Sequence, residues 1–142
     1  MYNFTTCQLI NIKLQLSQIP SLKMLILFGS QARGNTHPNS DYDFAVLYQE
    51  SYRPTGFEYF KIYEQLADIF NILSDEIDVV DLNYCSDLTA HNIARDGQVL
   101  YEAQEGLFDS FRQQALMSDA ELKQLRQELR QDINDFLTKS SL

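Results

Sequence analysis

The strongest constraint on this chain is a glycine–serine pair that is followed, ten residues later, by two aspartates separated by one residue. Gly29 and Ser30 come directly after an apolar run at residues 25–28. Asp41 and Asp43 come just before a second apolar run at residues 44–47. Short apolar runs bounded by small and polar residues are typical of buried strands. The pattern therefore predicts two strands joined by a small turn at Gly29 and a loop over residues 31–40.

The two aspartates indicate a cation site. Residues i and i+2 of a strand point to the same face, so Asp41 and Asp43 would present their carboxylates side by side. Neighbouring carboxylates raise each other's pKa unless a positive group lies between them, and Mg²⁺ readily takes one or two carboxylates together with phosphate oxygens. Gly29 allows the backbone to approach a ligand closely, and Ser30 offers an N–H and a hydroxyl to phosphate. These residues together predict a site for Mg²⁺ and a nucleoside triphosphate.

A third acid, Asp78, lies inside a β-branched run at residues 77–80. A carboxylate among apolar neighbours is costly unless it has a partner, so the position suggests a functional role. The two histidines, His37 and His91, are far apart in the sequence and have no metal-ligand spacing. We do not expect either histidine to be catalytic.

Composition excludes several classes of function. The net charge of −9 argues against a nucleic-acid substrate, which would require a basic surface, and is compatible with a basic protein partner or simply with solubility. The two cysteines form no disulfide framework and no metal pattern, and no apolar run reaches membrane-spanning length. We therefore expect a soluble protein of the reducing cytoplasm, with no membrane contact.

Hydrophobic periodicity predicts one α/β or α+β domain with a single small sheet flanked by helices. Residues 4–19 fit either a strand or a helix, and their glutamine and leucine content together with Pro20 favours the helix. A capping-box pattern, Thr55 to Glu58, precedes a long helical stripe. Strands are expected at residues 23–28, 43–48, 76–82 and 99–101, with a short helix at residues 86–95.

The C-terminal part differs from the rest. A second capping-box pattern begins at Ser118, and leucines, Ile133 and Phe136 then recur every three or four residues on one side of a polar helix. This amphipathic helix could fold back on its own core, or it could dock a partner or a second copy of the chain. Both alternatives remain open at the level of sequence.

The segments Leu27–Gly34 and Ser40–Asp43 resemble the signature of the DNA polymerase β-like nucleotidyltransferase superfamily, and of its minimal nucleotidyltransferase (MNT) branch in particular. Glu76–Leu82 resembles the strand that carries the third acid of that branch, and Gly97–Tyr101 resembles the usual end of the domain. The resemblance implies an MNT domain over residues 1–105, with a helical extension over residues 106–142. It also implies the fold of that superfamily, a small mixed sheet flanked by helices.

The resemblance implies a role for each matching residue. Gly29 and Ser30 would hold the triphosphate, Asp41 and Asp43 would bind Mg²⁺, and Asp78 would complete the acidic triad and assist deprotonation of the attacking hydroxyl. Arg33 could neutralise phosphate charge or fix its loop by pairing with a nearby acid. Asp81 lies an odd number of residues from Asp78 and should face the other side of the strand.

Proteins of this branch are often antitoxins encoded beside HEPN-domain toxins, which are typically RNases. The leading expectation is therefore an enzyme that transfers AMP from ATP, with Mg²⁺, to a tyrosine of a HEPN toxin. One alternative is an antitoxin that neutralises its toxin by binding alone. Another is a small-molecule nucleotidyltransferase of the aminoglycoside-modifying kind, although the residues after the region of resemblance are too few for the further helical domain that those enzymes carry, unless a partner chain supplies it. The sequence does not specify whether the chain would assemble with a second copy or with the toxin.

Overall fold

Four short segments pair into one mixed sheet in the computed structural model, which describes residues 5–34 and 41–140. The strands are β1 (Leu22–Phe28), β2 (Tyr42–Tyr48), β3 (Ile77–Asp81) and β4 (Gln98–Glu102). Their order across the sheet is β3-β2-β1-β4. β1 is antiparallel to both β2 and β4, whereas β2 and β3 are parallel. The helices are α1 (Thr6–Ser17), α2 (Gly29–Arg33), α3 (Gly56–Phe70), the short 3-10 helix η1 (Ser74–Glu76), α4 (Asp87–Asp96), α5 (Leu107–Ala115) and α6 (Asp119–Ser140).

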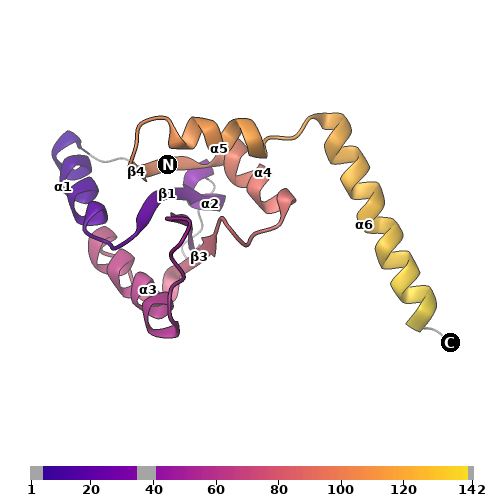
Figure 1. Cartoon of the computed structure of the whole chain (residues 1–142), viewed down its shortest axis with the longest axis horizontal. Coiled ribbons are helices and arrows are strands. Elements are labelled where there is room, and N and C mark those ends of the chain that lie inside the picture. Colours follow the sequence, from indigo (N-terminus) through magenta and orange to yellow (C-terminus); the bar gives the residue numbers. More distant parts are fainter. Residues whose placement is uncertain (1–4, 35–40, 141–142) are drawn as a thin grey trace.

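Alternation along the strands gives the sheet two different apolar faces. Leu25 and Leu27 of β1 pack with Leu66 of α3 and Leu16 of α1 on the first face. Met24 and Ile26 of β1 lie on the second face with Ile93 of α4, and the aromatic side chains of α5 pack against them. Helices therefore cover both sides of the sheet, and its ends carry the connecting turns (Figure 1).

Local capping signals set where the helices begin. The Thr5 hydroxyl accepts the N–H of Gln8 at 3.2 Å, which establishes residues 6–17 as a helix and resolves the ambiguity of this segment. The Thr55 hydroxyl likewise accepts the N–H of Glu58 at 3.3 Å, and the Glu58 carboxylate accepts the N–H of Thr55 at 3.2 Å. The predicted capping box at the start of α3 is therefore confirmed.

The loop predicted over residues 31–40 is wrong in its first part, because residues 29–33 form the short helix α2. α2 ends at Gly34, whose φ of 77° places it in the left-handed conformation that closes many helices. The prediction of a flexible turn over residues 35–40 falls outside the described residues.

The C-terminal region has two parts. α5 is fixed to the body, because the Glu102 carboxylate accepts the N–H of Phe108 at 3.0 Å and the Arg112 guanidinium donates to the carbonyl of Ala94 at 3.0 Å. The Ser118 hydroxyl accepts the N–H of Glu121 at 3.1 Å immediately before α6, and α6 then projects away from the sheet (Figure 1). It does not fold back on the core, so that alternative is wrong for this structure. Among the described helices, none has the combination of length and apolar character needed to span a bilayer.

Candidate active site

The candidate site lies where three neighbouring strands meet at one end of the sheet. The pairing register places Phe28 of β1 beside Asp43 of β2, and Asp43 beside Asp78 of β3. Because residues at equal heights in neighbouring strands point to the same face, the two carboxylates lie next to each other on the sheet. Asp43 is partly buried and Asp78 is exposed. The expectation that Asp78 is embedded in apolar surroundings is therefore wrong, because β3 is an edge strand and leaves this side chain in solvent.

Gly29 connects β1 to α2 directly against the Asp43 carboxylate. Its φ is 72°, a conformation that side chains with a Cβ rarely adopt. A Cβ at this position would overlap with Oδ2 of Asp43 and lie 3.1 Å from its Cγ. Both the backbone conformation and the available space therefore require glycine here. Ser30 follows as the second residue of α2 and is partly buried.

Electrostatics links all three acids. Burial raises the pKa of Asp43 above its ordinary value, and the charges of Asp78 and then of Asp41 raise it further. The Arg33 guanidinium lowers the pKa of the same carboxyl and so partly offsets these effects. The expected mutual repulsion of neighbouring carboxylates is thus present, and an additional positive charge would relieve it.

Arg33 is shared between the acids of the site and a fourth acid, Asp96. One guanidinium nitrogen of Arg33 lies 3.9 Å from Oδ2 of Asp96, at the limit of an ion pair. Asp96 is held more closely by its neighbour Arg95, whose Nε and terminal nitrogen donate to it at 3.1 and 2.8 Å. The Arg33 side chain is 48% exposed, so this long contact leaves its guanidinium accessible to solvent. The sequence contained no signal for Asp96, because its proximity to Arg33 depends on the packing of α4 beside α2.

The donor set suits a hard divalent cation that also binds phosphate. Within the described residues, no group of three or more histidine, cysteine or acidic side chains is arranged to hold a metal ion by itself. The acids Asp41, Asp43 and Asp78 nevertheless supply carboxylate oxygens, and Mg²⁺ usually combines one or two of these with phosphate oxygens and water. These residues fit a cation that arrives with a nucleotide better than a permanent protein cage.

Two residues from the sequence analysis lie away from this surface. Asp81 pairs in register with Val46, whose side chain belongs to the face covered by α1 and α3, so the prediction that it faces away from Asp78 is confirmed. Its carboxylate accepts the N–H of Asn83 at 2.9 Å and thereby supports the turn after β3. His91 is buried in α4, and its Nδ1 accepts the N–H of Met117 at 3.0 Å. His91 therefore has a structural contact, and His37 lies outside the described residues.

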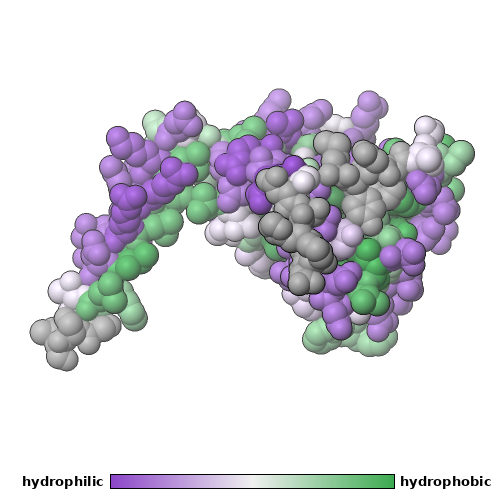
Figure 2. Space-filling view, turned by 180° about the vertical axis from the view of Figure 1, so that it is seen from behind, coloured by the Kyte–Doolittle hydropathy of each residue, from purple (hydrophilic) through white to green (hydrophobic). Residues whose placement is uncertain are grey.

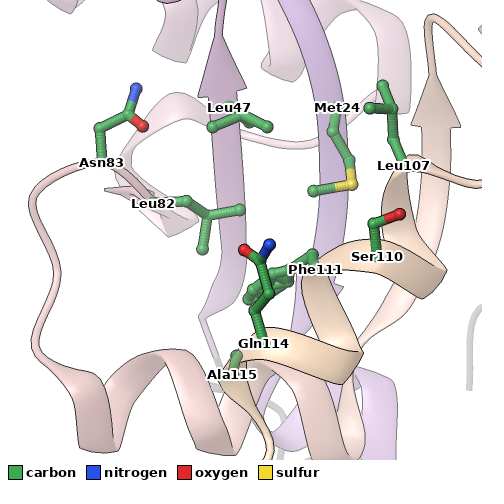
Figure 3. Close-up of a pocket in the computed structure, with 9 residues that line it drawn as sticks. All are labelled: Met24, Leu47, Leu82, Asn83, Leu107, Ser110, Phe111, Gln114 and Ala115. Atoms are coloured by element: carbon green, nitrogen blue, oxygen red, sulfur yellow. The ribbon is translucent and has the colours of Figure 1, made fainter.

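An apolar pocket lies at the opposite end of the same sheet (Figure 3). Figure 3 shows Met24 of β1, Leu47 of β2 and Leu82, which follows β3, facing Phe111 of α5 across the pocket. Met24 and Leu47 are paired near the start of β1 and the end of β2, whereas Asp43 lies at the start of β2. The pocket therefore does not include the acidic residues.

Comparison with known proteins points to one family. The family described as "Polymerase beta, Nucleotidyltransferase" matches residues 10–106. A relative named protein adenylyltransferase MntA, from Aphanizomenon flos-aquae (strain 2012/KM1/D3), is 46% identical over 136 residues, which cover 87% of this chain and 86% of the relative.

Solved structures share the fold over almost the whole chain. A structure described as a toxin–antitoxin with AMP-PNP has a TM-score of 0.61 at 25% identity, and the match covers 95% of this chain and 99% of the other. A second structure, described as a tri-AMPylated Shewanella oneidensis HEPN toxin in complex with MNT antitoxin, has a TM-score of 0.58 at 22% identity, with 93% and 97% covered. The predicted fold class, a small mixed sheet flanked by helices with a C-terminal helix, is confirmed.

Proposed function

We propose that this chain, which belongs to the polymerase β nucleotidyltransferase family, transfers AMP from ATP to a tyrosine hydroxyl of a HEPN-type RNase toxin and so neutralises it. The family makes the chain a nucleotidyltransferase, as the sequence predicted. Two observations support the finer proposal. The Aphanizomenon relative is named a protein adenylyltransferase, and the structure with AMP-PNP is described as a toxin–antitoxin.

The observation that carries the proposal is the register that places Asp43 beside Asp78, with Gly29 against the Asp43 carboxylate. In this arrangement Gly29 and Ser30 would bind the triphosphate through backbone N–H groups and the serine hydroxyl. Asp41, Asp43 and Asp78 would hold Mg²⁺, which when bound would neutralise charge on the phosphates. Arg33 would add a guanidinium beside the same phosphates.

The reaction is an in-line displacement at the α-phosphorus. The acceptor oxygen forms a bond to this phosphorus while the bond to the oxygen that bridges the α- and β-phosphates breaks, and pyrophosphate leaves with that electron pair. The proton of the acceptor hydroxyl passes to Asp78, whose exposed carboxylate lies on the edge strand where a second protein can approach. Catalysis in this chemistry is mostly positioning and charge neutralisation, which are the properties that this surface offers.

We also propose a division of labour along the chain. Residues 1–105 would form the nucleotidyltransferase domain, and residues 106–142 would form an extension that contributes to partner binding. The exposed apolar face of α6 favours this second role and also motivates the alternative that the chain neutralises its partner by binding alone.

Intact-mass spectrometry tests the proposal. The chain is incubated with Mg²⁺, labelled ATP and a candidate HEPN-domain partner protein, and the masses of both proteins are then measured. We expect one or more AMP masses on the HEPN protein, localised to tyrosine by fragmentation, and none with the Asp41→Ala, Asp43→Ala variant. Tight association without any added mass in the wild type would contradict transfer and favour neutralisation by binding alone.

A further inference from the structure

We propose that the apolar face of α6 docks into a groove between two helices of the partner protein, and that this contact is separate from the nucleotidyl-transfer site. The inference rests on the proposed function, because the partner is the same protein that accepts AMP. The groove has an apolar floor, an acidic rim on one side and a basic rim on the other. Each of these properties follows from the side chains that α6 exposes.

The first observation is a continuous apolar band on a helix that leaves the body. Leu129, Ile133 and Leu137 are 43%, 57% and 58% exposed, and they lie four residues apart on one side of the helix. Figure 2 shows this side of α6 as a green band beside a purple polar side. Complete burial of an exposed leucine or isoleucine side chain is favourable by roughly 1.5–3 kcal/mol, and about half of that gain is still available to each of these half-exposed side chains.

The band is too broad and has the wrong spacing for pairing with the α6 helix of a second copy. Leu122, Leu125 and Leu129 begin a pattern of three and four, but the next position of a seven-residue repeat is Asp132. A parallel pair of α6 helices would place the two Asp132 carboxylates opposite each other in the seam. The apolar side instead shifts to Ile133, and such a wide face is typical of a helix that lies in a groove of other helices.

The charges that border the band are segregated by sign. At 100° per residue, Lys123, Arg126 and Arg130 lie along one border. Glu121, Glu128 and Asp132 lie along the other border. Each border has one exception at an end of the helix, Asp119 on the first and Lys139 on the second. The complementary groove therefore has acidic side chains opposite the first border and basic side chains opposite the second. This pattern fixes the direction in which α6 can lie, because a reversed helix would place like charges together.

Such a docking contact would act as a tether. α5 is fixed to the body by the contact of Arg112 with Ala94, and Met117 is fixed by His91, so the start of α6 has a defined position relative to the sheet. A partner held on α6 is therefore held at a high effective concentration near Asp43 and Asp78. Docking should consequently lower the KM for the partner and leave the chemical step unchanged.

Binding and kinetic measurements with the full-length chain and the HEPN-domain protein that it modifies test this inference. The variant Leu129→Asp, Ile133→Asp should raise the Kd for the HEPN protein, measured without ATP, at least about 100-fold. The KM for the HEPN protein should rise in parallel, while kcat at saturating partner and the affinity for ATP stay within about twofold of wild type. Circular dichroism verifies that helix content is retained.

The matched control adds the same two charges to the opposite face of α6, as Gln127→Asp and Gln131→Asp, and should bind like wild type. Wild-type affinity of the Leu129→Asp, Ile133→Asp variant would overturn the docking proposal even if AMP transfer is intact. If the wild type binds the HEPN protein tightly but transfers no AMP to it, the docking proposal stands and the proposed enzymatic function is contradicted. Light scattering tests the alternative that α6 binds a second copy of the chain. If the wild type is a dimer, and the Leu129→Asp, Ile133→Asp variant is a monomer with unchanged affinity for the HEPN protein, the second copy is the occupant and the proposal is overturned.

Discussion

The acidic end of the sheet and the helix α6 both expose groups that the rest of the chain does not stabilise. At the sheet end these groups are negative charges, whereas on α6 they are apolar side chains. At the sheet end, Asp43 is partly buried beside Asp78, with one guanidinium to offset the repulsion. On α6, the apolar side chains of Leu129 and Ile133 are exposed to solvent, although their burial would be favourable. The first region lacks positive charge, and the second lacks apolar contact.

This difference indicates what each region binds. A site rich in carboxylates is completed by a cation and by the phosphates that accompany it. An exposed apolar band with charged borders is completed by another protein. The two regions share no residues and are joined through α5. Substitutions in one region should therefore have little effect on what the other region binds. Substitutions in each region test that independence.

The largest expected effect comes from removing carboxylates at the sheet end. Asp41→Ala with Asp43→Ala should lower AMP transfer at least about 10³-fold, because metal-assisted charge neutralisation is worth several kcal/mol. Affinity for the HEPN protein should remain within about threefold of wild type. Transfer is measured by intact mass and affinity by calorimetry. Retained transfer would disprove the assigned roles of these aspartates, and lost affinity would show that the two regions are not independent.

Replacing Gly29 should affect both the fold and the chemistry. Gly29→Ala requires a left-handed backbone at φ 72° and a Cβ in the space of the Asp43 carboxylate, so we expect a loss of at least about 1–2 kcal/mol in the free energy of unfolding, together with loss of transfer. Gly56→Ala is the control, because a Cβ there has no atom within 4 Å. Urea denaturation measures both variants. Equal stability of the two would contradict the close approach of Gly29 to Asp43.

Arg33 should have a smaller effect that is confined to the nucleotide. Arg33→Ala should raise the KM for ATP about tenfold, because one charge-assisted contact to phosphate is worth about 1.5 kcal/mol. Arg95→Ala is the matched control, since Arg95 also pairs with Asp96 but is not among the groups that shift the pKa of Asp43. Steady-state kinetics with varied ATP separates the two. Equal effects would indicate that Asp96, rather than the nucleotide, is the functional partner of Arg33.

The smallest expected effect concerns stability and its pH dependence. Because the pKa of Asp43 is raised in the folded state, the folded protein binds this proton more tightly than the unfolded chain. The ionised group therefore opposes folding at neutral pH, and this cost disappears as the pH falls through the folded-state pKa toward the unfolded value. Asp43→Asn should raise Tm by about 1–3 °C at pH 7.5 without Mg²⁺.

The difference in Tm between Asp43→Asn and the wild type should become smaller as the pH approaches 4, because Asp43 of the wild type is then increasingly protonated and uncharged. Asp68→Asn on the exposed side of α3 serves as the control and should change Tm little at either pH. Thermal unfolding followed by circular dichroism gives both values. A variant that is less stable than wild type at neutral pH would contradict the electrostatic account of this carboxyl.

Much of the fold followed from local signals in the sequence. The strand predicted at residues 43–48 corresponds to β2 at Tyr42–Tyr48, and the one predicted at residues 76–82 corresponds to β3 at Ile77–Asp81. The capping residues Thr55 and Ser118 marked the starts of α3 and α6. α2 was missed because five residues provide too little periodicity for a helix to be recognised. Gly34 after Arg33 was the available signal for its end.

By itself, the sequence determined which residues could carry the chemistry. The spacing from Gly29 to Asp43 indicated a site for Mg²⁺ and a nucleoside triphosphate, because the number and type of polar groups are written directly in the chain. The resemblance of these residues to the polymerase β-like signature indicated nucleotidyl transfer. The roles of these residues remain predictions, whereas the family is established by the match over residues 10–106.

Only the tertiary structure decided how these groups meet and which surfaces remain open. The register between β2 and β3 brought Asp78 beside Asp43, and the edge position of β3 left Asp78 in solvent. The packing of α4 beside α2 supplied Asp96 as a neighbour of Arg33, and α6 turned outward rather than back. The physical reason is that side-chain identity is a local property, whereas burial and proximity depend on contacts between residues far apart in the chain.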